Sequence, residues 1–190
     1  MAQQLYGDRP WKLAPNEALD KLMEFFAARL RNYFMSQGQD TLLVDAALGA
    51  GAEDVKDCGA RLAALAAFSQ EPGYEAAVQT FKRVANILRK QAQAEDVPGH
   101  WDPALLREDA EKALATTLED MLPRLDALWA AHDHTAALDC LRTVRPAVDA
   151  FFGGVMVMCD EEDLRRNRLA MLRGLGARFA RLADFSALQM

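Results

Sequence analysis

The sequence of this chain lacks the features that mark secreted, membrane-spanning and disulfide-rich proteins. Its three cysteines, Cys58, Cys140 and Cys159, lie far apart, and no C-x-x-C pair occurs. An odd number of separated cysteines is typical of reduced thiols in a cytoplasmic protein. The opening residues, MAQQLYGDRPWKL, have neither the charged start nor the apolar stretch of a signal peptide. No uncharged apolar run reaches the roughly eighteen residues of a membrane span, so we expect no membrane partner.

Catalytic signatures are also missing. The sequence contains no Ser/His/Asp set, no G-x-x-x-x-G-K loop and no G-x-G-x-x-G turn, and we therefore predict no catalytic residue. His132 and His134 flank an acid in a predicted loop between two helices. Such a pair is common without a metal, so we expect no metal ligands here.

Strand-forming patterns are nearly absent. Alanine and leucine dominate, β-branched residues are sparse, and the only alternating stretch is VMVM at 155–158. We expect Met156 and Met158 to fill the core. Apolar residues instead recur at three- and four-residue spacing, which predicts an all-α bundle of about seven to nine helices.

Capping residues and prolines predict where these helices begin and end. Asn16, Asp40 and Asp133 are expected N-caps. Pro123 should kink or restart a long helix over about 104–131, and Pro146 should begin another. Residues 1–15 read as a lead-in or linker near a cut boundary, and residues 16–190 as one helical domain.

The charge balance excludes a generally basic protein but permits a local basic patch. The formal net charge is −6 and the pI is about 5.1, which argues against a general nucleic-acid or membrane binder. The segment FKRVANILRK at 81–90 nevertheless contains four cations and no acid. On a helix, Lys82, Asn86 and Arg89 share one edge, while Arg83 lies roughly opposite the apolar stripe.

This edge has two interpretations. Cations can pair with RNA phosphates, and the Asn86 amide can donate and accept toward a base edge. Alternatively, the cations form a solvated face that balances acids on neighbouring helices.

The last predicted helix raises the same question. Residues 164–183 contain six arginines and no acid, and Arg165 and Arg168 project close to the apolar stripe. An arginine in that position needs a partner, because an unpaired buried charge is costly. The partner is either a ligand or an internal acid, with Asp149 and the acids of 160–163 as candidates. Arg29 on the first helix is expected to pack its stem and pair with an acid.

Four stretches together resemble one family. FKRVANILRK, RPAVDAFFGGVMVMCDEEDLRRNRLAMLRGL, RLADFSALQ and LMEFFAARLRNYFMSQGQDTLLVDAAL are similar, in the same order, to the C-terminal part of the bacterial glycyl-tRNA synthetase beta subunit. The likeness spans about residues 18–189. One departure is Gly153, which stands where the family commonly has Asp. If that Asp holds an arginine of the last helix in the family, that arginine needs another partner here.

The resemblance implies a DALR-type anticodon-binding domain and a role in an aminoacyl-tRNA synthetase. In this family the alpha subunit activates glycine with ATP and Mg²⁺, so we expect no cofactor in this domain. The implied partners are tRNA-Gly, the alpha subunit and the remaining beta-subunit domains, without DNA. The candidate RNA-binding residues are Lys82, Arg83, Asn86, Arg89, Arg165 and Arg168. The alternative is a helical module that docks the alpha subunit or other beta domains and touches RNA little.

Overall fold

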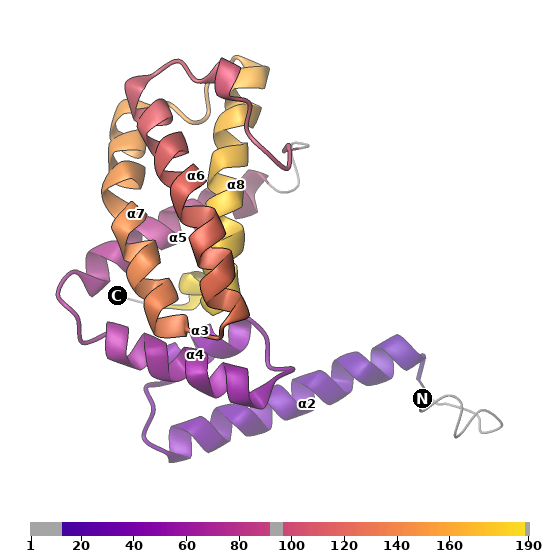
Figure 1. The fold of residues 1–190 in the computed structure, drawn as a ribbon. Helices are drawn as coiled ribbons and strands as arrows, with labels where there is room; N and C mark the ends of the chain where they lie inside the picture. The colour runs from indigo at the N-terminus through magenta and orange to yellow at the C-terminus, as the bar shows by residue number, and fades with distance from the viewer. Residues whose placement is uncertain (1–12, 92–96, 189–190) are drawn as a thin grey trace.

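The computed structural model describes residues 13–91 and 97–188, so most of the predicted lead-in 1–15 lies outside the described residues. The described part is helical throughout, without strands, which confirms the all-α prediction (Figure 1). Its α-helices are α2 (Pro15–Ser36), α3 (Thr41–Gly49), α4 (Val55–Phe68), α5 (Tyr74–Gln91), α6 (Asp109–Ala130), α7 (His134–Gly154) and α8 (Glu162–Leu182). Two short 3₁₀ helices are η1 (Pro103–Leu105) and η2 (Phe185–Ala187). None of these helices is both long and apolar enough to cross a bilayer.

Most helix starts follow the predicted caps. The side chains of Asp40 and Asp133 accept hydrogen bonds from backbone N–H groups in the first turns of α3 and α7, as predicted. The Asn16 cap was wrong, because α2 already begins at Pro15, preceded by Ala14. Proline suits the first position of a helix, where its missing N–H has no intrahelical partner to lose.

Neither internal proline divides its helix. Pro123 lies inside α6 and Pro146 inside α7, so the separate helix predicted to start at Pro146 is wrong. Both prolines are exposed, as are Glu119 and Arg142, whose carbonyls lose their i+4 donors. Water can bind those carbonyls, which lowers the cost of the missing hydrogen bonds.

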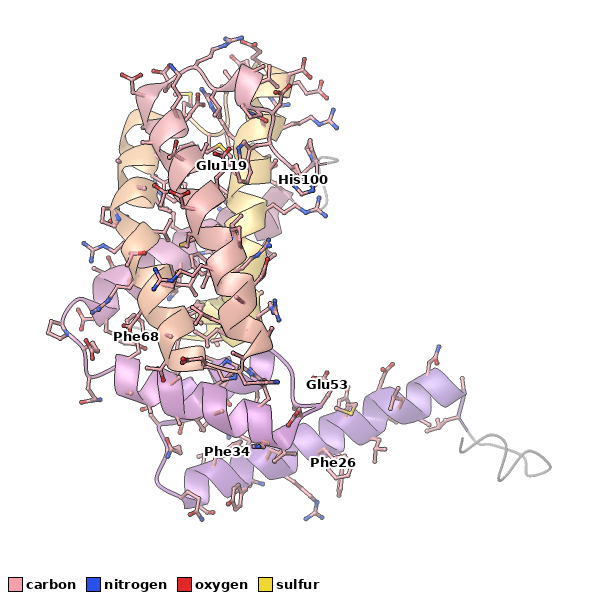
Figure 2. All side chains as sticks on the ribbon, viewed as in Figure 1. Phe26, Phe34, Glu53, Phe68, His100 and Glu119 are labelled. Atoms are coloured by element: carbon pink, nitrogen blue, oxygen red, sulfur yellow. The ribbon has the colours of Figure 1, made fainter. Side chains whose placement is uncertain are left out.

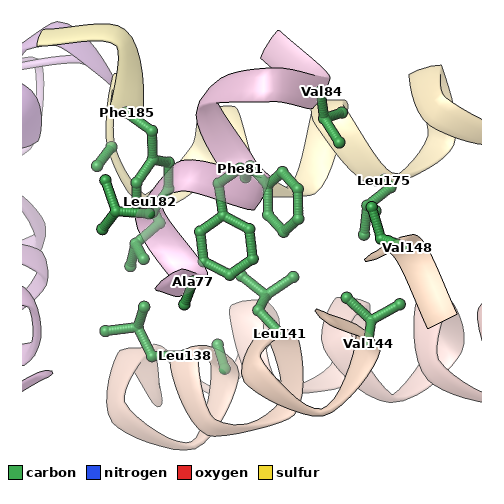
Figure 3. Packing of buried hydrophobic residues seen from close by; sticks show 14 of the residues in the cluster. Ala77, Phe81, Val84, Leu138, Leu141, Val144, Val148, Leu175, Leu182 and Phe185 are labelled. Carbon is green, nitrogen blue, oxygen red and sulfur yellow. The ribbon is translucent and has the colours of Figure 1, made fainter. Parts of the chain in front are cut away.

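One part of the core lies where α5 crosses α7 and α8, behind the row formed by α6, α7 and α8 (Figure 1). The ring of Phe81 in α5 packs 4.2 Å from that of Phe179 in α8 and 5.0 Å from that of Phe185 in η2. Leu141 and Val144 of α7 close the other side of this cluster (Figure 3). The inner face of α5 is therefore fixed, and its opposite face points outward.

The VMVM stretch forms no strand but a connection between α7 and α8. The prediction that Met156 and Met158 fill the core is wrong, because they are 75% and 42% exposed. Val155 and Val157 are buried instead. Side chains of this stretch do alternate between buried and exposed, but the valines rather than the methionines face the bundle.

Helix α2 forms an arm at the base of the molecule. Its C-terminal end is attached to the bundle by buried Phe34 and by the Arg31–Asp45 ion pair, with Nε 2.5 Å from Oδ1. Figure 1 shows the N-terminal half extending away from α3 and α4, and Figure 2 shows Phe34 beneath α4 and Phe26 farther along the arm.

Candidate nucleic-acid interface

The outer face of α5 contains a shallow hollow of about 510 Å³. Phe81 and Val84 are fully buried, so the side of α5 that carries them packs into the core. The hollow lies on the other side of the helix, which faces outward. The hollow is lined by Gln79, Lys82, Arg83, Asn86, Ile87 and Lys90. Three of the predicted site residues therefore lie together on one surface.

Internal contacts hold the predicted α5 side chains in place. Lys82 Nζ donates a hydrogen bond to the carbonyl of Leu188 at 2.6 Å, and the Arg83 guanidinium lies 4.1 Å from the ring centre of Phe152. Arg89 Nη2 donates to Asn86 Oδ1 at 2.9 Å, beside the hollow. These contacts orient the polar groups before any ligand binds, which lowers the entropy lost on binding.

The cations of this face lack acidic partners in the part of the chain that the structure describes. No carboxylate within the described residues pairs with Lys82, Arg83, Arg89 or Lys90. Other arginines, such as Arg178 with Asp126 at 2.7 Å, do have acidic partners. A face of unpaired cations and one amide can bind an anionic backbone and a base edge.

Arg168 lies in a different environment. It is 5% exposed, its Nε donates to Oε1 of the fully buried Glu111, and its Nη1 donates to the carbonyl of Met156 at 2.9 Å. The expected candidates, Asp149 and the acids of 160–163, were wrong for this arginine, because Glu111 is its acidic partner. Asp149 instead accepts from Thr80 and Arg145. Arg168 therefore ties α8 to the start of α6.

The Glu111 carboxylate remains ionised at this junction. Burial raises its pKa, but hydrogen bonds from the backbone N–H of Glu108, the Arg168 guanidinium and the backbone N–H of Arg107 outweigh burial and lower the pKa below its usual value. The pair is thus a charged internal crosslink, and it needs neither Asp at position 153 nor a ligand.

Arg165 is likewise held at the beginning of α8. Its Nη1 donates to the carbonyl of Cys159 at 2.7 Å. Helix α5 crosses α8 near Gly176, where Val84 and Leu88 approach closely. Eleven residues separate Arg165 from Gly176, or about 16 Å along the helix. The two predicted basic groups therefore do not form one continuous ridge.

Sequence reasoning did not include Gln79, Ile87 and Lys90 among the site residues, although all three line the hollow. Lys90 and Arg83 fall on the same outer side of α5, seven residues or about two turns apart. That spacing could have identified Lys90, whereas the stacking of Arg83 on Phe152 depends on the tertiary fold.

A second polar cluster joins α4 to the turn between α6 and α7. Oδ1 of Asp57 lies 2.9 Å from both His132 Nδ1 and His134 Nε2, and Oδ2 lies 2.8 Å from Arg61 Nε. The three potential metal-ligand atoms of Asp57, His132 and His134 lie within 4.8 Å of one another. Sequence alone could not place Asp57 there.

The surroundings of this cluster favour hydrogen bonding over metal binding. Nδ1 of His134 is buried and has no hydrogen-bond partner among residues 13–91 and 97–188, and the same holds for Nε1 of Trp129, whose ring lies 5.4 Å away. A metal on His134 Nε2 would require a proton on that Nδ1 and leave a buried donor unsatisfied. Arg61 adds positive charge beside the same carboxylate. The cluster is best described as a clasp centred on Asp57.

The fold and the outer face of α5 define a helical module with an exposed cationic surface. The DALR anticodon binding domain family matches residues 78–182, which span α5 to α8. This match covers more than half of the chain, and the chain belongs to that family.

The curated relatives described next share one protein name. The chain is 56% identical over 191 residues to the glycine–tRNA ligase beta subunit of Oleidesulfovibrio alaskensis, covering 100% of this chain and 27% of the relative. It is 57% identical over 188 residues to that of Nitratidesulfovibrio vulgaris strain Hildenborough, covering 98% and 27%. Identity to the subunit of Anaeromyxobacter sp. strain K is 41% over 180 residues, covering 94% and 25%. The chain thus spans about a quarter of the length of these relatives.

Proposed function

We propose that this chain is the tRNA-binding, anticodon-recognition domain of a glycine–tRNA ligase beta subunit. In that role it supports ATP-dependent glycylation of tRNA-Gly by the alpha subunit, in the cytoplasm. The observation that carries the proposal is the hollow on α5, where oriented cations without an acidic partner among the described residues lie within the segment matched by the anticodon-binding family. ATP and Mg²⁺ belong to the alpha subunit, and this domain uses no cofactor.

The side chains of the hollow have separate roles in this proposal. Arg83 and Lys90 bind phosphates of the anticodon loop, and Arg89 holds the amide of Asn86 toward a base edge. Unstacked loop bases expose their edges to such groups. Lys82 anchors the Leu188 carbonyl and adds positive charge. Arg165 shapes the start of α8, and Arg168 acts only through the fold.

The experiment measures binding of a glycine tRNA anticodon stem-loop and of one with altered anticodon bases. The Arg83→Gln, Lys90→Gln double variant should weaken binding of both stem-loops about tenfold, since an exposed ion pair contributes up to about 1 kcal/mol. The slope of log affinity against log salt should fall by about 1.4, at about 0.7 per lost phosphate contact. The Asn86→Ala variant should mainly reduce the preference for the glycine anticodon.

A matched control removes the same charge elsewhere. Lys56 on α4 and Arg124 on α6 are also exposed, so the Lys56→Gln, Arg124→Gln variant should bind within twofold of the unchanged chain. Equal losses in both double variants would mean that only net charge matters. Equal binding of both stem-loops by the unchanged chain would refute anticodon recognition, and no binding of whole tRNA at low salt would refute the RNA role of this chain.

A scaffold module that docks the alpha subunit or other beta domains is the second candidate function. The apolar side chains exposed along α2 favour a protein contact of some kind. Co-migration of this chain with the alpha subunit in the absence of tRNA would support that function.

A further inference from the structure

The exposed apolar surface of the described residues is concentrated on α2. Residues Leu19, Leu22, Phe25, Phe26 and Tyr33 are between 47% and 56% exposed. Leu19, Leu22, Phe26 and Tyr33 follow a spacing of three, four and seven, which places them in one stripe along the helix. Glu17, Asp20 and Glu24 occupy the opposite side. Helix α2 is therefore amphipathic, and its apolar side faces away from its own bundle.

An arm of this kind is not stable by itself in water. Isolated helices of about fifteen residues are marginal, because most helix stability in proteins comes from packing an apolar face. Among the described residues, α2 is attached mainly through its C-terminal end. The stripe is therefore a surface that needs a partner.

The size of the stripe indicates what kind of partner covers it. A whole aromatic side chain presents about 150–250 Å² and a leucine less, so the five half-exposed side chains present at most about 500 Å². Stable contacts between separate proteins bury about 800 Å² on each side, whereas domains within one chain associate through smaller areas because they are tethered. The area thus favours a partner on the same polypeptide.

The comparisons supply a source for that partner. The first curated relatives match nearly all of this chain over only 27% of their own length, so about three quarters of each relative lies outside the match. Resting on the proposed function, we propose that the α2 stripe docks on another part of the beta-subunit polypeptide.

Arg29 adds a requirement on the docking surface. Its guanidinium stacks 4.5 Å from the ring centre of Phe25, and no acid among the described residues pairs with it, so the expected ion pair stays a prediction. In a parallel pair of α2 helices, two Arg29 side chains would meet within the stripe and repel each other. The partner surface is therefore apolar and carries a carboxylate opposite Arg29.

Cysteine labelling tests the proposal in a chimera in which this chain replaces the matched region of the Nitratidesulfovibrio vulgaris subunit. Leu22→Cys reports on the stripe, and Glu24→Cys, on the polar side of the same helix, is the control. Cys159, the half-buried native thiol, is changed to Ser in both. Maleimide should react with Cys at position 22 at least tenfold more slowly in the chimera than in the 190-residue chain. The rate at position 24 should change less than twofold.

Equal rates at position 22 in both proteins would overturn the proposal. Protection that grows with the concentration of the free chain would assign the stripe to a second copy, and protection only after the alpha subunit is added would assign it to that subunit. Both results would also overturn the proposal, and none of them depends on RNA binding.

A second measurement needs no chimera. Backbone hydrogen exchange is compared between the intact Nitratidesulfovibrio vulgaris subunit and its isolated matching region. The N-terminal half of the helix that corresponds to α2 should exchange at least tenfold more slowly in the intact subunit. Equal exchange in both would contradict docking.

Discussion

Replacing Arg168 by Met tests whether this arginine serves the fold or a ligand. The guanidinium and the Glu111 carboxylate are both buried, and Arg168 also satisfies the carbonyl of Met156. The variant leaves a buried carboxylate that retains only backbone N–H donors from Arg107 and Glu108, at 2.7 and 2.9 Å. Removing one partner of a buried ion pair costs about 3–5 kcal/mol. The loss is large beside the total of about 5–15 kcal/mol for a typical domain.

The assay is urea unfolding of the 190-residue chain followed by far-ultraviolet circular dichroism. Arg107→Met is the matched control, because Arg107 also pairs with a glutamate, Glu161, but both side chains are at least half exposed. A surface ion pair contributes about 0–1 kcal/mol, so the control should lose no more than that.

A loss below about 1 kcal/mol for Arg168→Met would refute the reasoning, since it would mean that Glu111 does not depend on the guanidinium. Weaker RNA binding by a fully folded Arg168→Met variant would return this arginine to the candidate interface.

Two further predictions concern the clasp at α4. The pKa of Asp57 is lowered to about 2, because hydrogen bonds from His132 and Arg61 outweigh the burial that raises it. An unfolded Asp has a pKa of about 3.9, so this carboxylate stabilises the fold above about pH 4, and its contribution is lost as the pH falls toward 2. Asp57→Asn should lower the free energy of unfolding by about 1–3 kcal/mol at pH 6. The urea midpoint of this variant should also depend less on pH between pH 4 and pH 2 than that of the unchanged chain, and an equal pH dependence in the two proteins would contradict the prediction. Arg61→Met should cost about 3–5 kcal/mol, because the buried guanidinium also donates to the carbonyls of Ala47, Gly51 and Leu182. Fluorescence-monitored urea unfolding measures that loss, and a cost below 1 kcal/mol would be evidence against the crosslink.

Local patterns in the sequence predicted the helices well. Asp40 and Asp133 accept hydrogen bonds from backbone N–H groups no more than three residues further along the chain. Both partners of such a cap therefore lie in one short stretch of sequence, which makes the cap predictable. The restart at Pro123 and the new helix at Pro146 were wrong because the cost of proline depends on whether the carbonyl four residues earlier faces water. That exposure is set by the packing of α6 and α7, which local spacing does not determine.

The site was predictable only in part, for the same reason. The outer face of α5 follows from helical spacing, and the structure places Lys82, Arg83 and Asn86 around one hollow. The need of Arg168 for a partner was also predictable from its place near the apolar stripe. Its partner Glu111 lies 57 residues earlier, and only the packing of α6 against α8 brings the two together.

The cations of this chain therefore divide by environment rather than by sequence. Arg61 and Arg168 are buried and crosslink helices, so we expect their removal to act through the stability of the fold. Arg83 and Lys90 are exposed on a face whose opposite side is already packed, so their removal leaves the core intact. Because the chain has a net charge of −6, its field repels RNA over most of the surface and attracts it at local cationic faces. On the proposed function, an acidic body with a cationic face on α5 would thus orient an approaching anticodon loop before any base is read.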